Sequence, residues 1–216
     1  MKYYMDTEFI ETDVKTLFGK KRVRELISVG IYCEDGREYH AFLKDTPLKL
    51  IWNLKDNFVK NNVLQRIHED QSRQMNQFAK QFFGNLWKEF TLSSMRWIFK
   101  HYGRSRENMK SEIFHFMRIV DDDYGYICTE PIEIYTYYGA SDWVYFTELL
   151  GGMMKLPKNF PMYSMDLKVM LQDRGLSKEW KQLHCPDPPG EHHALTDALW
   201  NHKLHQTIQV YDQSRW

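Results

Sequence analysis

Residues 3–11 read YYMDTEFIE, and the predicted fold is built outward from this stretch. Its aromatic first half is typical of a β-strand, and side chains two residues apart in a strand point to the same face. Asp6 and Glu8 are therefore expected to face one point at the end of the strand. Carboxylates this close repel each other, so they require a divalent cation, a basic partner or exposure to water. The pattern alone is common and favours exposure.

The residues around this stretch predict a three-stranded meander. Lys2–Met5 is expected to form a short first strand, and residues 12–24 form a polar, basic stretch. An apolar strand over Glu25–Cys33 and another over Arg37–Leu43 then flank a turn that contains Asp35 and Gly36. Asp-Gly between two such runs is a strong hairpin signal.

The rest of the chain predicts helices and one more strand. Between Trp52 and Val120, apolar residues recur at helical spacing, as at Ile113, Phe116 and Val120, which predicts three or four helices. A strand is expected over Ile132–Gly139, followed by a helix that has Ser141 as its N-cap and stops at Gly151. A second helix ends at Gly175, and a proline-rich loop over residues 184–191 then precedes the last helix. This order predicts an α/β fold, with a mixed β-sheet flanked by helices as in ribonuclease H-like proteins, although the order alone does not single that fold out.

Composition limits the classes of protein and partner. The chain has 216 residues, of which 43% are hydrophobic, enough for the core of one domain. Its formal net charge is zero, which argues against a strongly basic surface for long duplexes. The three cysteines match neither a disulfide framework nor a zinc cluster. Reduced thiols, the lack of an apolar leader and the lack of a long apolar run predict a cytoplasmic protein without a membrane span.

Two more acidic residues lie at the ends of predicted elements. Asp142 follows the strand that ends at Gly139, where a carboxylate also stabilises a helix N-terminus by about 0.3–1 kcal/mol. Asp197 lies in the last helix, five residues after His192. Five residues in a regular helix leave two side chains about 140° apart, so His192 is expected in the preceding loop or the first turn. Taken singly, the three residues also fit a helix cap, a solvated helix position and a surface histidine.

Together these residues form a specific pattern. Asp-x-Glu on a first strand, Asp at a strand-to-helix junction and His-x-Ala-x-x-Asp at a late helix resemble the DEDDh 3′–5′ exonuclease family. The matching segments are MDTEF, GASDW and HHALTD, and the residues are Asp6, Glu8, Asp142, His192 and Asp197. DTEFIE, ELISVGI, EDGREY, SRENMKSEI and DLKVMLQDRG are similar to bacterial adenylate-specific exoribonucleases of the RNase AS type. The similarity leaves out residues 65–101, which we expect to be a helical insertion within a single domain over residues 1–216.

The resemblance implies hydrolysis of phosphodiester bonds at the 3′ ends of single-stranded RNA, with two Mg²⁺ or Mn²⁺ ions per active site. It implies metal ligation by Asp6, Glu8, Asp142 and Asp197, with Asp6 between both ions and Asp142 acting partly through water. His192 would be the general base. The resemblance also implies a homodimer. The lack of a cysteine cluster argues against structural zinc, and His184, Cys185 and His193 have poor spacing for it.

Aromatic and basic residues near the acidic positions are candidate nucleic-acid contacts. Phe9 would wedge against the terminal base and Trp143 would stack on a base, a contact worth about 1–3 kcal/mol; burial in the core fits both residues as well. A basic loop that follows the first carboxylates would hold upstream phosphates, or it is simply solvated. Its residues are Lys15, Lys20, Lys21, Arg22 and Arg24.

Three functions stay open at this point. The first is an exoribonuclease, the second is an exodeoxyribonuclease with the same chemistry, and the third is an inactive nucleic-acid-binding module that keeps the fold. The presence of all five catalytic-type residues argues against the third.

Overall fold

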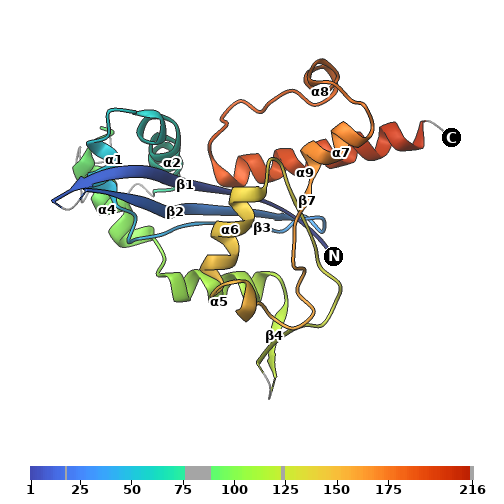
Figure 1. The fold of residues 1–216 in the computed structure, drawn as a ribbon, viewed down its shortest axis with the longest axis horizontal. Coiled ribbons are helices and arrows are strands. Elements are labelled where there is room, and N and C mark those ends of the chain that lie inside the picture. The colour runs from blue at the N-terminus through green and yellow to red at the C-terminus, as the bar shows by residue number, and fades with distance from the viewer. Residues whose placement is uncertain (18, 76–88, 123–124, 215–216) are drawn as a thin grey trace.

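A five-stranded mixed sheet forms the centre of the protein (Figure 1). The computed structural model describes residues 1–216 except 18, 76–88, 123–124 and 215–216. The strand order is β3-β2-β1-β6-β7. β2 pairs antiparallel with both β3 and β1, whereas β6 pairs parallel with both β1 and β7. Their bounds are β1 Lys2–Thr16, β2 Gly19–Cys33, β3 Glu38–Phe42, β6 Glu133–Thr136 and β7 Met165–Asp166. The predicted α/β class is confirmed, and the sheet is compatible with a ribonuclease H-like fold.

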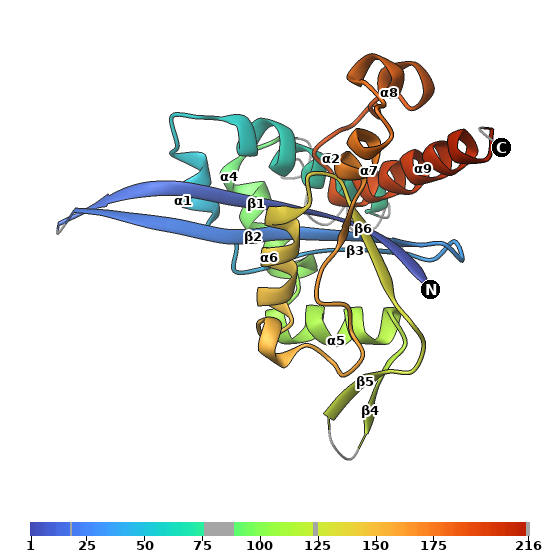
Figure 2. The same ribbon diagram turned by 45° about the vertical axis from the view of Figure 1, so that its right-hand side comes forward.

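Helices cover both faces of this sheet (Figures 1 and 2). α7 (Leu167–Asp173) and α9 (Ala194–Gln213) lie on one face, and α5 (Arg106–Phe116) and α6 (Ala140–Leu149) lie on the other. The remaining elements are α1 Leu48–Trp52, the π-helix η1 Val59–Leu64, α2 Gln65–Gln74, α4 Leu92–Tyr102, β4 Ile119–Asp122, β5 Gly125–Cys128, the 3₁₀-helix η3 Met153–Lys155 and α8 Lys178–His184.

The alternation of side chains in β1 sets the position of the acidic pair. Tyr3 and Met5 pack with α5 and α6, whereas Tyr4 packs with α7 and α9 on the opposite face. Ile10 lies in a further apolar cluster that includes residues of α1, α2 and α4. Tyr4, Asp6, Glu8 and Ile10 are alternate residues of β1 and point to the same face. Asp6 and Glu8 therefore lie between two apolar clusters. Because each fully buried apolar side chain contributes about 1.5–3 kcal/mol, these clusters can hold two repelling carboxylates in place.

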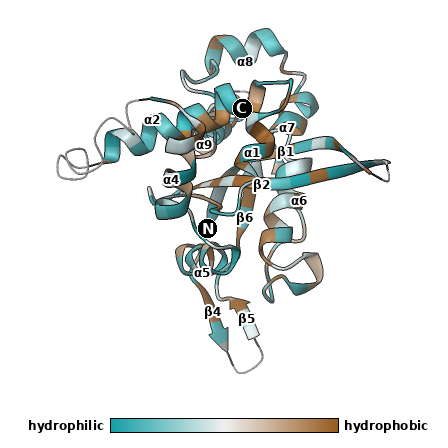
Figure 3. Ribbon diagram, turned by 90° about the vertical axis from the view of Figure 1, so that its left-hand side faces the viewer, coloured by the Kyte–Doolittle hydropathy of each residue, from teal (hydrophilic) through white to brown (hydrophobic). Residues whose placement is uncertain are grey.

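β1 and β2 continue far beyond the first predicted strand as a two-stranded ribbon. Residues 12–24, expected as a polar loop, belong almost entirely to these strands. Opposite charges face each other across the ribbon. Arg24 Nε binds Glu11 at 3.0 Å, and Arg22 binds Glu11 at 2.9 Å and Asp13 at 3.7 Å. Cross-strand pairs of this kind stabilise β-structure by about 0.2–1 kcal/mol each. The projecting part of the ribbon is accordingly mostly hydrophilic (Figure 3).

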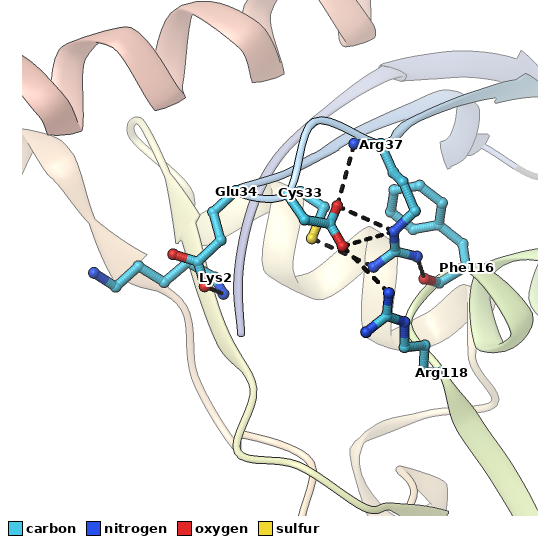
Figure 4. Close-up of polar contacts among 7 residues, drawn as sticks. Lys2, Cys33, Glu34, Arg37, Phe116 and Arg118 are labelled. Carbon is cyan, nitrogen blue, oxygen red and sulfur yellow. Dashed lines mark hydrogen bonds and ion pairs between the residues drawn. The ribbon is translucent and has the colours of Figure 1, made fainter.

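The predicted hairpin between β2 and β3 is confirmed, and its turn is tied to distant elements (Figure 4). Arg37 Nε donates to Asp35 Oδ2 at 2.9 Å, and Arg37 Nη1 donates to the backbone oxygen of Phe116 at the end of α5. The backbone N–H of Lys2 donates to Glu34 Oε1 at 2.7 Å. These bonds join the turn to α5 and to the start of β1.

The prediction of a helix through Val120 is wrong. α5 ends at Phe116, and Arg118 has a positive φ of 58°, which turns the chain out of the helix. Val120 instead pairs with Ile127 in a short hairpin of β4 and β5 that no sequence pattern indicated. The β-branched pair Ile119 and Val120 favours the strand once the helix has ended.

The described helices of the expected insertion pack on the central sheet. Ile67 of α2 and Ile98 and Phe99 of α4 are fully buried in the cluster that contains Ile10. The rings of Phe99 and Phe42 lie 4.6 Å apart, which joins α4 to β3. Residues 76–88 of the expected insertion lie outside the described residues. The segment 65–101 therefore packs, where it is described, on the same sheet that positions Asp6 and Glu8.

Two expectations from composition can be compared with the structure. Cys33, Cys128 and Cys185 are all buried with free thiols. Among the residues that the structure describes, no helix combines the length and the hydrophobicity needed to cross a bilayer. The cytoplasmic location stays a prediction.

Candidate active site

An open edge and a bulge make room beside Asp6 and Glu8. β6 pairs with β1 only as far as Tyr4, and in the described residues no strand pairs with this edge of β1 beyond that point. The register with β2 shifts directly after Glu8, which marks a β-bulge. Bulges bend a strand and re-aim its side chains, and they are frequent beside active sites. Glu8 is 8% exposed and Asp6 is half-buried, so both carboxylates lie in the space that other elements approach.

α6 brings a third carboxylate to the free edge of β1. Asp142 lies in its first turn, and Asp142 Oδ1 accepts bonds from the Thr7 backbone N–H at 3.0 Å and from Thr7 Oγ1 at 2.6 Å. The N-cap of this helix is Gly139, so the prediction of Ser141 as N-cap is wrong. α6 begins earlier because Asp166 accepts the Gly139 N–H at 3.1 Å, which fixes the chain at the end of β6.

Gly30 determines how closely α9 approaches the sheet. It pairs with Asp6 in the β1–β2 ladder, and a Cβ built on it would lie 2.1 Å from the carbonyl carbon of Ala194. A contact this close between two backbones requires glycine. The first turn of α9 therefore lies on β2 beside Asp6, and this contact brings Asp197 next to the acidic pair.

We expect Gly30→Ala to be strongly disruptive. The added methyl group must push the first turn of α9 away from β2, and overpacking of this kind costs about 1–3 kcal/mol. The melting temperature should fall by about 2–4 °C for each kcal/mol in a chain of this size. Thermal unfolding measures the effect. Ser28→Ala on the same strand is the control, because Ser28 Oγ is buried without a hydrogen-bond partner in the described structure. An equal fall in both variants would contradict the role of Gly30.

Carboxylates of β1 and α9 meet at one point. One oxygen from each of Asp6, Glu8 and Asp197 lies within 4.8 Å of the other two. Burial, and then the neighbouring carboxylates, raise the pKa of Asp6 and of Glu8 well above the ordinary values. Burial is also the largest cause that raises the pKa of Asp142 to about 6 and the pKa of Asp197 to about 7.

This donor set fits a divalent cation. None of the four carboxylates takes part in an ion pair with Lys or Arg in the described part of the chain. Repulsion among uncompensated carboxylates is relieved either by protonation or by a cation. Ligands that are all oxygen suit Mg²⁺ and Mn²⁺. The carboxylates Asp6, Glu8 and Asp197 can therefore bind a hard divalent ion.

The raised pKa values predict that the metal-free protein loses stability as the pH rises. A carboxyl group whose pKa is higher in the folded state favours folding while it is protonated. Its contribution is complete below the unfolded pKa of 3.8 and is lost as the pH rises through about 6 for Asp142 and about 7 for Asp197. In EDTA, we expect the melting temperature to fall from pH 5 to pH 8 by less in Asp197→Asn than in the wild type. Parallel falls in the two proteins would count against this electrostatic account.

His192 lies in the loop before α9, as the sequence predicted. Its backbone N–H donates to Asp197 Oδ2 at 2.9 Å, and its ring meets the ring of Phe58 edge-on, with centroids 4.8 Å apart. Its φ of 68° is strained for a residue with a side chain, at about 1–3 kcal/mol, and such strain is concentrated at functional sites. His192, Asp6 and Asp197 line one cleft of about 280 Å³.

Sequence reasoning missed several residues of this cleft. Asn201 Nδ2 donates to the backbone oxygen of Met5 at 3.0 Å, which fixes α9 to β1. Trp200 Nε1 donates to the oxygen of Pro186 at 2.9 Å and holds the loop before α9. Asn201 is four residues after Asp197, so helical spacing placed it on the same face and offered a signal. The other lining residues that were missed are Tyr137, Asp187, Pro188 and Glu191.

The expected stacking role of Trp143 is not available in this structure. Trp143 is 8% exposed and belongs to the core cluster beneath α6, with its ring 6.2 Å from that of Phe146. The alternative of burial in the core is therefore correct. Phe9 is half-buried and stacks on Tyr145, with centroids 4.4 Å apart. Its contact with a base stays a prediction.

The basic residues expected around the phosphates lie far along the ribbon. Lys20 pairs with Lys15 of β1, and Lys15 is nine residues beyond Asp6. At about 3.3 Å per residue, Lys20 therefore lies roughly 30 Å from Asp6 along the ribbon. Lys21 is exposed one position closer, and Arg22 is paired with Glu11 at 2.9 Å. These residues therefore lie on a ribbon and not in a loop, and their contact with upstream phosphates stays a prediction.

Comparison with known proteins identifies relatives with a stated activity. The chain is similar to proteins from two strains of Mycobacterium tuberculosis, CDC 1551 and H37Rv, that are named 3′–5′ exoribonucleases. Each is 29% identical over 198 residues, which cover 92% of this chain and 87% of the relative. The aligned span therefore includes at least part of residues 65–101. No protein-family model matches the chain.

Proposed function

We propose that this chain is a metal-dependent 3′–5′ exoribonuclease of the DEDDh type, acting on single-stranded RNA. The main support is the grouping of Asp6, Glu8 and Asp197, with His192 lining the same cleft as Asp6 and Asp197. The charge of Asp142 in α6 also acts on Asp6 and Glu8. The relatives' names agree with the 3′–5′ exoribonuclease activity. An inactive binding module would have no need to keep four repelling carboxylates with raised pKa values together at a cost in stability.

Asp6, Glu8 and Asp197 would hold divalent cations, Mg²⁺ or Mn²⁺, with two ions per site and Asp6 shared between them. Asp142 Oδ1 is occupied by two bonds from Thr7, so Asp142 would contribute through Oδ2 and partly through water. Such ions supply the positive charge that stabilises the attacking and leaving oxygens of a phosphodiester.

The protein groups have separate tasks in the proposed reaction. The ring of His192 would take the proton of the attacking water, as a general base does. The bond from its backbone N–H to Asp197 couples the position of this loop to the acidic site. Asn201 and Gly30 fix α9 on the sheet and would thereby position Asp197.

The direction and the substrate can be tested with end-labelled oligomers. We expect 5′-labelled single-stranded RNA to shorten stepwise from its 3′ end in Mg²⁺ or Mn²⁺, and to stay intact in EDTA. The same oligomer with a blocked 3′ end and the matching DNA are the controls. Faster degradation of DNA than of RNA would favour the exodeoxyribonuclease. Tight RNA binding without cleavage under all metal conditions would favour the binding module.

The resemblance to adenylate-specific enzymes leads to a finer proposal about the base at the 3′ end. We expect RNA that ends in several adenylates to be degraded faster than RNA that ends in uridylates or cytidylates. Rates on oligomers that differ only in their last four bases measure this preference. Equal rates would remove the adenylate proposal and leave the exoribonuclease proposal standing.

The organisation of the chain also leads to proposals. We infer that residues 1–216 form a single catalytic domain, with residues 65–101 as a helical insertion that packs on the sheet through Ile67, Ile98 and Phe99. The expected homodimer and the cytoplasmic location stay predictions. Sedimentation of the purified protein measures the first of these.

A further inference from the structure

A second group of metal-ligating side chains lies apart from the four carboxylates. His40 comes from β3, Asp70 from α2, and His193 from the residue before α9. One potential ligand atom of each residue lies within 4.8 Å of the other two. The imidazole rings of His40 and His193 are 4.3 Å apart between centroids, at an angle of 46°. Three elements that are distant in sequence therefore present two imidazoles and a carboxylate to one point.

Both histidines have a buried nitrogen with no partner. Nε2 of His40 and Nε2 of His193 make no hydrogen bond in the described structure. Buried polar atoms are almost always satisfied, so two unpartnered nitrogens side by side indicate a site for a ligand. Burial, and then the neighbouring His193, lower the pKa of His40 to about 3. The ring of His40 is therefore neutral at physiological pH, which is the form that binds metal ions.

The environment of His193 allows its Nε2 to bind a metal ion. His193 Nδ1 now caps α9 by accepting the Thr196 N–H at 3.4 Å, which is a long bond. The hydroxyl Oγ1 of Thr196 lies 3.3 Å from the same nitrogen. If Nε2 becomes a ligand, the ring proton moves to Nδ1, which can then donate to Thr196 Oγ1. A metal-binding histidine usually has a donor bond of this kind on its second nitrogen.

We propose that His40, Asp70 and His193 bind one divalent transition-metal ion, for which Zn²⁺ is the representative case. Imidazole nitrogens suit zinc and related ions, whereas Mg²⁺ prefers oxygen ligands only. Tetrahedral zinc needs ligand atoms about 3.3 Å apart, given metal–ligand distances of about 2.0–2.2 Å. The present ligand atoms lie within 4.8 Å of one another, so small side-chain rotations would bring them to that spacing. Three protein ligands leave the fourth position to water.

An adjacent cleft offers access for the ion and for that water. It has a volume of about 160 Å³, and Asp70 and His193 are in its lining. Arg66 and Arg73 also line it, and both pair with Glu69, at 3.3 Å and 4.0 Å. Their charges are therefore partly neutralised, which lowers the repulsion of an entering cation.

Bound at this position, the ion would connect α2 to β3 and to the residue next to His192. It would hold the loop that contains His192, and helix α2 of the proposed insertion, on the sheet. This site is separate from the proposed catalytic metal site, because the two sites share no ligand and differ in ligand type.

Zinc binding by the full chain in excess Mg²⁺ tests the proposal, because Mg²⁺ would compete with Zn²⁺ for the carboxylate site. Equilibrium dialysis followed by metal analysis should find about one Zn²⁺ per wild-type chain. His40→Gln and Asp70→Asn should bind Zn²⁺ at least about tenfold more weakly. His184→Gln is the matched control, because His184 is exposed and bonds to Trp180 at 2.8 Å, outside the group. It should bind Zn²⁺ as the wild type does. The visible spectrum of the Co²⁺ form should lose its nitrogen-ligand bands only in the first two variants.

Circular dichroism shows whether each variant is folded. If His40→Gln does not fold, Asp70→Asn tests the zinc site by itself, because Asp70 is only half-buried. Absence of bound Zn²⁺ in the wild type would overturn the proposal. Equal Zn²⁺ binding by Asp70→Asn and His184→Gln would overturn it as well.

Discussion

Asp6→Asn is expected to abolish nuclease activity and to make the metal-free protein more stable. Asp6 is the carboxylate proposed to be shared by both ions, and the loss of several kcal/mol of metal-ion stabilisation corresponds to about 10³-fold or more in rate. The same change removes one of four carboxylates that raise each other's pKa. The melting temperature in EDTA should therefore rise, by about 2–4 °C per kcal/mol of relieved repulsion.

Two measurements separate these effects. RNA cleavage with end-labelled oligomers gives the rate, and thermal unfolding with and without Mg²⁺ gives the stability. Asp13→Asn is the matched control, because Asp13 lies in the same strand but is exposed and paired with Arg22 at 3.7 Å. It should have wild-type activity and a wild-type shift in Mg²⁺. Near-normal turnover by Asp6→Asn would exclude Asp6 from the catalytic site. A lower melting temperature in EDTA would mean that the acidic group stabilises the fold.

His192→Ala is expected to lower the cleavage rate by about 10²–10⁴, the usual range for a lost general base. The bond to Asp197 comes from the backbone of His192, so it should persist in the variant. We therefore expect the stabilisation by Mg²⁺ to stay close to that of the wild type. Single-turnover cleavage measures the rate, and thermal shift in Mg²⁺ measures the metal site.

His193→Ala distinguishes the two neighbouring histidines. His193 caps α9 and faces His40 and Asp70, away from the acidic group, so its removal should lower stability more than the rate. A larger loss of rate in His193→Ala than in His192→Ala would show that the general base is assigned to the wrong residue. His184→Ala, outside the cleft, controls for the general loss of a histidine.

The sequence by itself determined the shared face of the acidic pair, the β2–β3 hairpin and the loop position of His192. A period of two places Asp6 and Glu8 on one face whatever the surroundings. Asp35-Gly36 specified the hairpin, because its backbone conformation favours that turn. Prolines before α9 excluded a helix there and left His192 in a loop, since proline has no N–H to donate. All three conclusions rest on local backbone chemistry, which a sequence states directly.

The tertiary structure decided the rest, because it depends on which distant groups come together. The sequence around Trp143 fits either stacking on a base or burial in the core, and only the packing under α6 shows that Trp143 is buried. The charges of residues 12–24 indicate a solvated loop until Glu11 is seen opposite Arg24. Gly30 is an ordinary strand glycine until Ala194 is seen against it. The grouping of His40, Asp70 and His193 follows from three elements whose sequence separations give no periodic signal.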